Sequence, residues 1–369
     1  MPPVIIAARR TPIGEAGGAL ANRTADELAA PVLRAVLDDV GIERVDDVLL
    51  GNVLGPGGNP ARVAALRAGL GESIPGMTID RQCASGLSAI TTAASMVAGE
   101  EFFLAGGVES PSTAPWRAWR PRTPTEPPRF YQRAPFAPAE IGDPDMGPAA
   151  DLVAAEAGIG RHRQDAFAAR SHARAVAARD AGRFDDELVP IGSSDADERP
   201  RRGFTPERLA RFRPAFTPDG TTTAANSCGI NDGAAAVLMT SEEQRARLGV
   251  PGLRLLGART SGVDPNRLGL GAVPAMRALR ERHAPEVVEF NEAFAGQALA
   301  CLDAAGIDEE IAGPDGGAIA LGHPWGASGA VLVVRLFSRM VRQDGPRIGM
   351  AALSSGGGLG VATMWERVG

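Results

Sequence analysis

The chain has 369 residues, of which 44% are hydrophobic and 22% are charged. This composition is typical of a globular protein with a buried core, and the length suggests two or three domain-sized units. A net charge of −6 argues against nucleic-acid binding, and the lack of an uncharged apolar run of about 18 residues argues against a membrane span. The chain has no lysine, which excludes Schiff-base and P-loop chemistry.

The first half of the chain alternates strand and helix patterns. A helix is predicted over 24–40, with Thr24 as its N-cap, and a small-residue helix follows the segment RQCASG and runs to about Ala98. The other elements expected in this half are a short helix near 60–69 and strands at 4–8, 48–53, 78–80 and 102–107. Strands that alternate with helices predict an α/β fold with a parallel or mixed sheet covered on both faces.

From about 112 to 225 the sequence is rich in proline and arginine, and only one convincing helical stretch is expected there, at roughly 149–182. We interpret this region as an excursion from the sheet that carries binding loops. Residues 231–241 then resume as helix or strand. The second half repeats the order of the first. Strands are expected at 253–258, 287–290, 347–355 and 361–365. Helices are expected near 273–282, after the NEAFA segment, and from the segment GGAIALGHPWGASG to about Met340.

The three cysteines are widely spaced and contain no CxxC pair, so we predict neither a disulfide framework nor a metal site. Cys83 follows a predicted strand and lies at the first turn of a predicted helix. The helix N-terminus would lower the pKa of its thiol and make it a nucleophile. The alternative is an inert buried cysteine.

His323 lies among glycines in the segment GGAIALGHPWGASGA, where the backbone could approach a ligand closely. Imidazole is the usual base for a thiol nucleophile, although a structural role is the alternative. The other histidines, at positions 162, 172 and 283, have charged surroundings and are expected at the surface. Asn291 and Glu292 could form part of an oxyanion site or could cap a helix. The segment GGGLG that begins at Gly356 is interpreted as a tight turn beside the site rather than a phosphate cradle.

Taken together, these segments resemble the thiolase family over nearly the whole chain. Further matching segments are RTPIG (10–14), GNVL (51–54), NPAR (59–62), GGVES (106–110) and NSCGINDGAAA (226–236). The resemblance implies a five-layer αβαβα fold built of two similar halves. The N-terminal half would comprise 1–111 and 226–247, an inserted coenzyme A-binding loop domain 112–225, and the C-terminal half 248–369.

The resemblance also implies functional roles. Cys83 would be the acylated nucleophile, His323 would activate it, and Asn291 would hold a catalytic water. Arg201 matches a position near the nucleotide end of coenzyme A, and the pantetheine tunnel would be lined by Met146, Phe216, Cys228 and Phe294. Coenzyme A would be substrate or product, and no cofactor would be tightly bound. The expected assembly is a homodimer or homotetramer, and the N-terminal apolar run is too short for a signal peptide, which favours the cytoplasm.

This chain departs from the family pattern at the position of the second catalytic cysteine, where it has Ser354. A serine hydroxyl is a far poorer base than a thiol, so Claisen chemistry should be slow unless another group substitutes. Asp145 replaces a histidine, Cys228 replaces a serine, and Trp325 could narrow the acyl pocket. Cys301 is expected in the core.

Three functions remain open from the sequence. The first is thiolysis or Claisen condensation by a thiolase-like acyltransferase. The second keeps the acyl-enzyme on Cys83 but uses decarboxylative condensation, hydrolysis or another acceptor. The third is a non-catalytic protein that binds acyl-CoA. Neither the acyl chain length nor the metabolic direction follows from the sequence.

Overall fold

The computed structural model describes residues 1–369, and its first half follows the predicted alternation of strands and helices. The elements are β1 (Pro3–Arg10), β2 (Gly14–Glu15), α1 (Ala25–Asp38), β3 (Asp47–Gly51), α2 (Pro60–Arg67), β4 (Met77–Ile79), α3 (Ser85–Met96) and β5 (Phe103–Glu109). Thr24 and Glu27 form a capping box at the start of α1, so the predicted N-cap is confirmed.

After the excursion, β8 (Asn231–Ser241) completes the N-terminal block of strands, and α7 (Glu242–Leu248) follows it. The second half then contains β9 (Gly252–Gly262), α8 (Val273–Arg280), β10 (Val287–Phe290), α9 (Ala295–Ala305), α10 (Ala318–Leu321), α11 (Trp325–Phe337), β11 (Ile348–Ser355) and β12 (Leu359–Val368). Residues 231–241 are therefore a strand, which decides between the two possibilities that the sequence left open.

The strands form a mixed sheet in the order β10-β11-β12-β9-β1-β8-β5-β3-β4, and β2 pairs with β8. The pairs β3–β4, β3–β5 and β10–β11 are parallel, and the other pairs are antiparallel. The strands of the two halves join where β1 meets β9, through the pairs Val4–Arg254 and Ile5–Leu253. Each half thus contributes one block of neighbouring strands.

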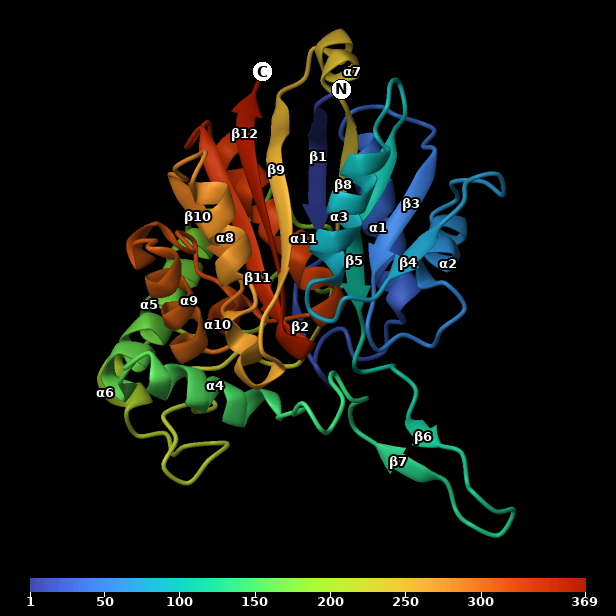
Figure 1. Cartoon of the computed structure of the whole chain (residues 1–369). Helices are drawn as coiled ribbons and strands as arrows, with labels where there is room; N and C mark the ends of the chain where they lie inside the picture. The colour runs from blue at the N-terminus through green and yellow to red at the C-terminus, as the bar shows by residue number, and fades with distance from the viewer.

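Helices cover the strands in five layers, which confirms the predicted αβαβα arrangement. Helices α3 and α11 pack against each other between the two blocks of strands, α1 and α2 cover the outer face of the N-terminal block, and α8 and α9 cover the outer face of the C-terminal block (Figure 1). The chain ends lie together at one end of the molecule (Figure 1). No helix combines the length and the apolar character that a membrane crossing requires.

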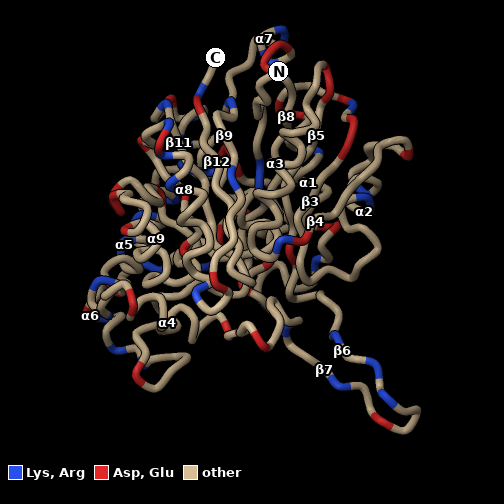
Figure 2. Tube along the Cα trace, in the orientation of Figure 1, with Lys and Arg blue, Asp and Glu red and all other residues tan.

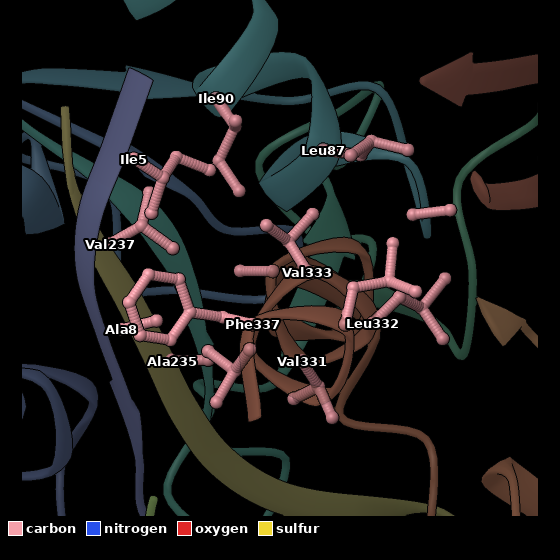
Figure 3. Packing of buried hydrophobic residues seen from close by; sticks show 14 of the residues in the cluster. Ile5, Ala8, Leu87, Ile90, Ala235, Val237, Val331, Leu332, Val333 and Phe337 are labelled. Atoms are coloured by element: carbon pink, nitrogen blue, oxygen red, sulfur yellow. The ribbon is translucent and has the colours of Figure 1, made fainter. Parts of the chain in front are cut away.

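Alternate residues of the strands enter different cores, because successive side chains of a strand point to opposite faces. In β1, Ile5 packs into the central core and Val4 into the outer core below α1; in β11, Leu353 faces the centre and Met350 the outer core below α8 and α9. Figure 3 shows the central core, in which Val331, Leu332, Val333 and Phe337 of α11 lie among Ile5, Leu87, Ile90, Ala235 and Val237. Both faces of each block are therefore buried.

The central helices approach so closely that some positions have no room for a side chain. A Cβ atom on Gly329 of α11 would lie 2.4 Å from the backbone nitrogen of Leu87 in α3. A Cβ atom on Gly86 would lie 2.7 Å from the carbonyl oxygen of Gly326. Glycine at these positions lets the two helix starts lie side by side.

Residues between β5 and β8 leave the sheet, as predicted, but contain more regular structure than expected. They form β6 (Arg117–Trp119), β7 (Arg129–Tyr131), α4 (Met146–Glu156), α5 (Arg161–Asp180) and α6 (Pro206–Leu209). The single helix expected over 149–182 is wrong, because α4 ends before Gly158, which has a φ of 68° that a helix does not permit. The β6–β7 hairpin projects from the body (Figure 1), and Figure 2 shows mostly basic positions along it.

Buried ion pairs fasten the excursion to both halves. Arg10 of β1 contacts Glu187 and Asp197 at 2.7 Å each. Arg335 of α11 pairs with Glu187 and, at 2.6 Å, with Asp315. Because all five side chains are almost fully buried, losing one partner would leave an uncompensated charge.

We predict that Gly329→Ala lowers the free energy of unfolding by roughly 1–3 kcal/mol, because the added methyl group must displace backbone of α3. Urea unfolding followed by circular dichroism measures this. Gly262→Ala is the matched control, since nothing lies within 4 Å of a Cβ atom there. Equal stability of the two variants would contradict the close contact between α3 and α11.

Candidate active site

Residues from both halves and from the excursion line one cavity of about 330 Å³. Most of the candidate residues from the sequence lie on its wall: Cys83, Met146, Phe216, Cys228, Phe294, His323 and Ser354. Asn291 lies behind the wall, in contact with His323. Arg201 does not reach the cavity; its side chain is 52% exposed and pairs with Glu15 at 3.0 Å. The structure thus brings together all the candidates except Arg201.

Cys83 is placed by a sharp turn between β4 and α3. Gln82 has a φ of 50°, which is uncommon for a residue other than glycine and turns the chain sharply just before Cys83. Ser355 of β11 clamps the turn, since its hydroxyl donates to the carbonyl of Arg81 at 2.9 Å and accepts from the amide of Ala84 at 3.4 Å. Cys83 is therefore held against the end of β11.

The predicted lowering of the Cys83 pKa is wrong. Helix α3 begins at Ser85, so Cys83 lies just outside the helix rather than in its first turn. Burial raises the pKa of the Cys83 thiol to about 12, and negative charge on Cys228, Glu109 or Asp80 raises it further. The desolvation of the thiolate outweighs the helix dipole, so the resting residue is a neutral thiol.

His323 lies directly before α11 and is held on both sides. Its Nδ1 lies 2.6 Å from the Ser328 hydroxyl, and its backbone amide donates to the Asn231 side chain at 2.9 Å. Burial lowers the pKa of the imidazole to about 4, so the ring is neutral near pH 7. A tautomer with hydrogen on Nδ1, donating to Ser328, leaves Nε2 free to accept a proton.

Asn291 follows β10 and points its amide at the imidazole. Its Nδ2 lies 3.5 Å from Nε2 of His323. Helix capping, the alternative for this segment, does not occur: the N-cap of α9 is Phe294, and no side chain bonds there. Glu292 instead accepts from the Ser171 hydroxyl at 2.6 Å, and burial raises its pKa to about 7.

Ser354 lies near the end of β11, on the cavity wall beside the glycine turn. Its Oγ accepts from the Ala272 amide at 3.0 Å and lies 3.8 Å from Sγ of Cys301. The turn after it contains Gly357 with a φ of 75°, and a Cβ on Gly356 would lie 2.7 Å from the Phe136 ring. The glycine segment is thus a tight turn between β11 and β12, as predicted, and not the start of a phosphate-binding helix.

One side of the cavity forms an apolar corridor. The rings of Phe216 and Phe294 pack edge to face, with their centroids 5.8 Å apart, and Met146 lies on the same wall. Cys228 is fixed there by its backbone amide, which donates to Ala293 at 3.0 Å. Burial raises the pKa of its thiol to about 12, although the nearby Arg199 guanidinium acts in the opposite direction.

A second cavity, of about 200 Å³, adjoins the first and shares Cys83 with it. Its wall includes Leu54, Arg117 and Phe136, and Trp325 lines both cavities. The side chain of Trp325 therefore limits the space beside Cys83, which is where the sequence suggested that it narrows an acyl pocket.

Two buried residues near the site, Glu109 and His172, were not predicted correctly from the sequence. Glu109 is a buried carboxylate that accepts from the amides of Val53, Leu54 and Gly326 at 2.9–3.1 Å, and burial raises its pKa to about 7. It ties the start of α11 to the chain after β3. His172, expected at the surface, is buried in α5, and its Nδ1 accepts from the amide of Arg201 at 3.2 Å. No spacing signal marks either residue, because their neighbours come from distant segments.

Comparison with known proteins gives the family. The thiolase N-terminal domain matches residues 3–243, and the thiolase C-terminal domain matches residues 251–367. The chain therefore belongs to the thiolase family, and it is an acyltransferase of that family.

Similar proteins extend over almost the whole chain. A putative acetyl-CoA C-acetyltransferase, YhfS, from Bacillus subtilis is 44% identical and covers 98% of both chains. The putative acetyl-CoA C-acetyltransferase VraB of Staphylococcus haemolyticus is 43% identical over 99% of this chain and 98% of its own. The crystal structure of the Bacillus anthracis acetyl-CoA acetyltransferase superposes with a TM-score of 0.91, at 36% identity, over 100% of this chain and 99% of that one.

We predict that iodoacetamide alkylates Cys83 at least about 30-fold more slowly than glutathione at pH 7.5, because a thiol with a raised pKa is almost entirely protonated there. The rate should still be rising at pH 10. Intact-mass time courses measure it, and Cys83→Ala identifies the labelled site. A rate that levels off below pH 8 would show instead that the thiolate is stabilised.

Proposed function

We propose that this protein transfers acyl groups between coenzyme A thiols through a thioester on Cys83, by thiolysis of 3-ketoacyl-CoA or the reverse Claisen condensation. One observation carries the proposal. Cys83 from the N-terminal half and His323 from the C-terminal half open onto a single cavity that continues into an apolar corridor. A thiol, a neutral imidazole and an enclosed channel are the parts that acyl transfer from a thioester requires.

In the proposed acylation the thiol and the imidazole start neutral. Sγ of Cys83 attacks the thioester or ketone carbon while its proton moves to Nε2 of His323. Asn291 stabilises the charge on the substrate oxygen, through a water that its amide holds next to the imidazole. Because burial disfavours the separated thiolate and imidazolium, charge develops only when the substrate oxygen is present to share it.

Coenzyme A is proposed as substrate and product rather than a resident cofactor. The pantetheine arm would lie along Met146, Phe216 and Phe294, beside Cys228, where the corridor is apolar. Arg201 would lie outside the corridor near the nucleotide, where its exposed guanidinium suits phosphate groups. The proposal includes the domain limits. The N-terminal half comprises 1–111 and 226–247, the coenzyme A-binding loop domain comprises 112–225, and the C-terminal half comprises 248–369.

Ser354 is proposed as the group that exchanges a proton with the α-carbon of the departing or attacking acyl-CoA. It lies on the cavity wall with Cys83 and His323. Decarboxylative condensation, hydrolysis or simple acyl-CoA binding would each leave Ser354 without this task, and no contact of the site favours them. We also propose a cytoplasmic homodimer or homotetramer, which light scattering of the purified protein would measure.

Incubation with acetoacetyl-CoA should add one acetyl group to Cys83, detectable by intact-mass and peptide analysis. Cys83→Ala should abolish the adduct, and His323→Ala should slow its formation by roughly 100-fold or more, because His323 is the imidazole that lines the same cavity as the thiol. Absence of any adduct would contradict the proposed acyltransfer. Condensation with malonyl-CoA but no thiolysis would support the decarboxylative alternative.

Ser328→Ala should slow acylation of Cys83 without abolishing it. Without Ser328, the Nδ1 hydrogen of His323 is a buried donor with no acceptor, which costs a free energy of about 1–3 kcal/mol. As an increase in the activation free energy, this corresponds to a roughly 5- to 150-fold lower acylation rate. Stopped-flow acylation with acetyl-CoA measures the change. Thr91→Val, which removes a half-buried hydroxyl of α3 that donates to the Ser88 carbonyl, is the control. An unchanged acylation rate would show that Ser328 does not orient the imidazole.

A further inference from the structure

Ser354 does not stand alone on the cavity wall, because a thiol lies directly behind it. Cys301 of α9 is fully buried and does not line the cavity, yet its Sγ lies 3.8 Å from Oγ of Ser354. That separation is within the range of a hydrogen bond to sulfur, whose larger radius lengthens such contacts. The hydroxyl thus lies between the substrate cavity and a thiol.

The surroundings of Cys301 hold its sulfur in place through hydrogen bonds. Sγ lies 3.0 Å from the carbonyl of Gly269, to which its one hydrogen donates when it does not point to Oγ of Ser354, and Sγ accepts from the side-chain amide of Gln297 at 3.4 Å. The Gln297 amide is itself fixed, since it also donates to Gly269 at 2.9 Å. Burial raises the pKa of the Cys301 thiol to about 12, while the hydrogen bonds from Ser354 and Gln297 lower it.

We propose that Cys301 is a positioning residue that acts through Ser354: the hydroxyl exchanges a proton with the substrate carbon, and the buried thiol replenishes or accepts that proton. The inference rests on the proposed function. Even with the pKa of Cys301 raised by burial, its thiol is a stronger acid than an alcohol, so the pair can supply what an isolated serine cannot.

The protons balance in the thiolysis direction. The Cys83 sulfur bonds to the ketone carbon as its proton moves to His323. The carbon–carbon bond breaks, and its electron pair stays on the departing acyl-CoA. That carbon takes the Ser354 hydroxyl proton while Oγ takes the proton of Cys301, leaving a thiolate that Ser354 and Gln297 hydrogen-bond.

The second half-reaction restores both residues. The incoming coenzyme A thiol gives its proton to Ser354, whose own proton passes to Cys301. The coenzyme A sulfur attacks the acyl group on Cys83, and the Cys83 sulfur leaves with the proton that His323 held. Condensation is the same sequence in reverse.

Cys228 is the other thiol near the site, but its position suits this role less well. It lies on the corridor wall beside Arg199, and no hydrogen bond joins it to Ser354. The Ser354 hydroxyl contacts Cys301 and the Ala272 amide instead.

The test compares thiolysis of acetoacetyl-CoA in two backgrounds, the wild type and Ser354→Cys. Cys301→Val, which keeps the core apolar and of similar volume, should lower kcat for thiolysis roughly 100-fold in the wild type. In the Ser354→Cys background it should change kcat by less than about 2-fold, because a thiol then faces the substrate directly. Cys301→Ala should behave in the same way.

Three outcomes would overturn the inference. Equal losses in both backgrounds would show that Cys301 only packs the core, and an unchanged kcat in the wild-type background would show that Ser354 works without it. Cys228→Ser should change kcat by the same factor in both backgrounds. A loss of kcat confined to the wild-type background would show that Cys228, and not Cys301, exchanges the proton with Ser354. Acetylation of Cys83 by acetyl-CoA needs no carbanion, so it should persist in Cys301→Val. Its absence from the wild type would instead contradict the proposed function.

Discussion

The site depends on the contact between α3 and α11, the two helices at the centre of the molecule. Cys83 precedes one helix and His323 precedes the other, so the distance between the helix starts sets the distance between the thiol and the imidazole. Gly86 and Gly329 permit that approach because neither has a Cβ atom to fill the interface. The blocks of strands on either side bury both helices and hold this spacing.

Burial then determines the charge state of the residues that the helices bring together. The Cys83 thiol and the His323 imidazole are both neutral, since the enclosed cavity disfavours thiolate and imidazolium alike. Buried arginines pair with carboxylates, as with Arg10 and Glu187, which join the excursion to the sheet. A neutral thiol is a weak nucleophile, so the burial of Cys83 limits its reactivity.

Much of the fold followed from the sequence, because strand and helix periods are local properties. The expected strands and helices occur close to their predicted positions, and the five-layer arrangement is confirmed. The single helix over 149–182 was wrong because its apolar pattern continues across Gly158, where the backbone turns. The surface position expected for His172 was wrong because its charged neighbours in the chain face away from the core.

The sequence by itself determined the thiolase family and the order of the elements, since both follow from local patterns and motifs, and the family resemblance named several of the residues that line the cavity. Only the tertiary structure decided the burial that raises the pKa of Cys83, the contacts of Glu109 and Ser328, and the placement of Cys301 behind Ser354. These features depend on burial and on contacts between segments far apart in the chain. A pKa or a hydrogen bond of this kind has no signature in the spacing of residues along one segment.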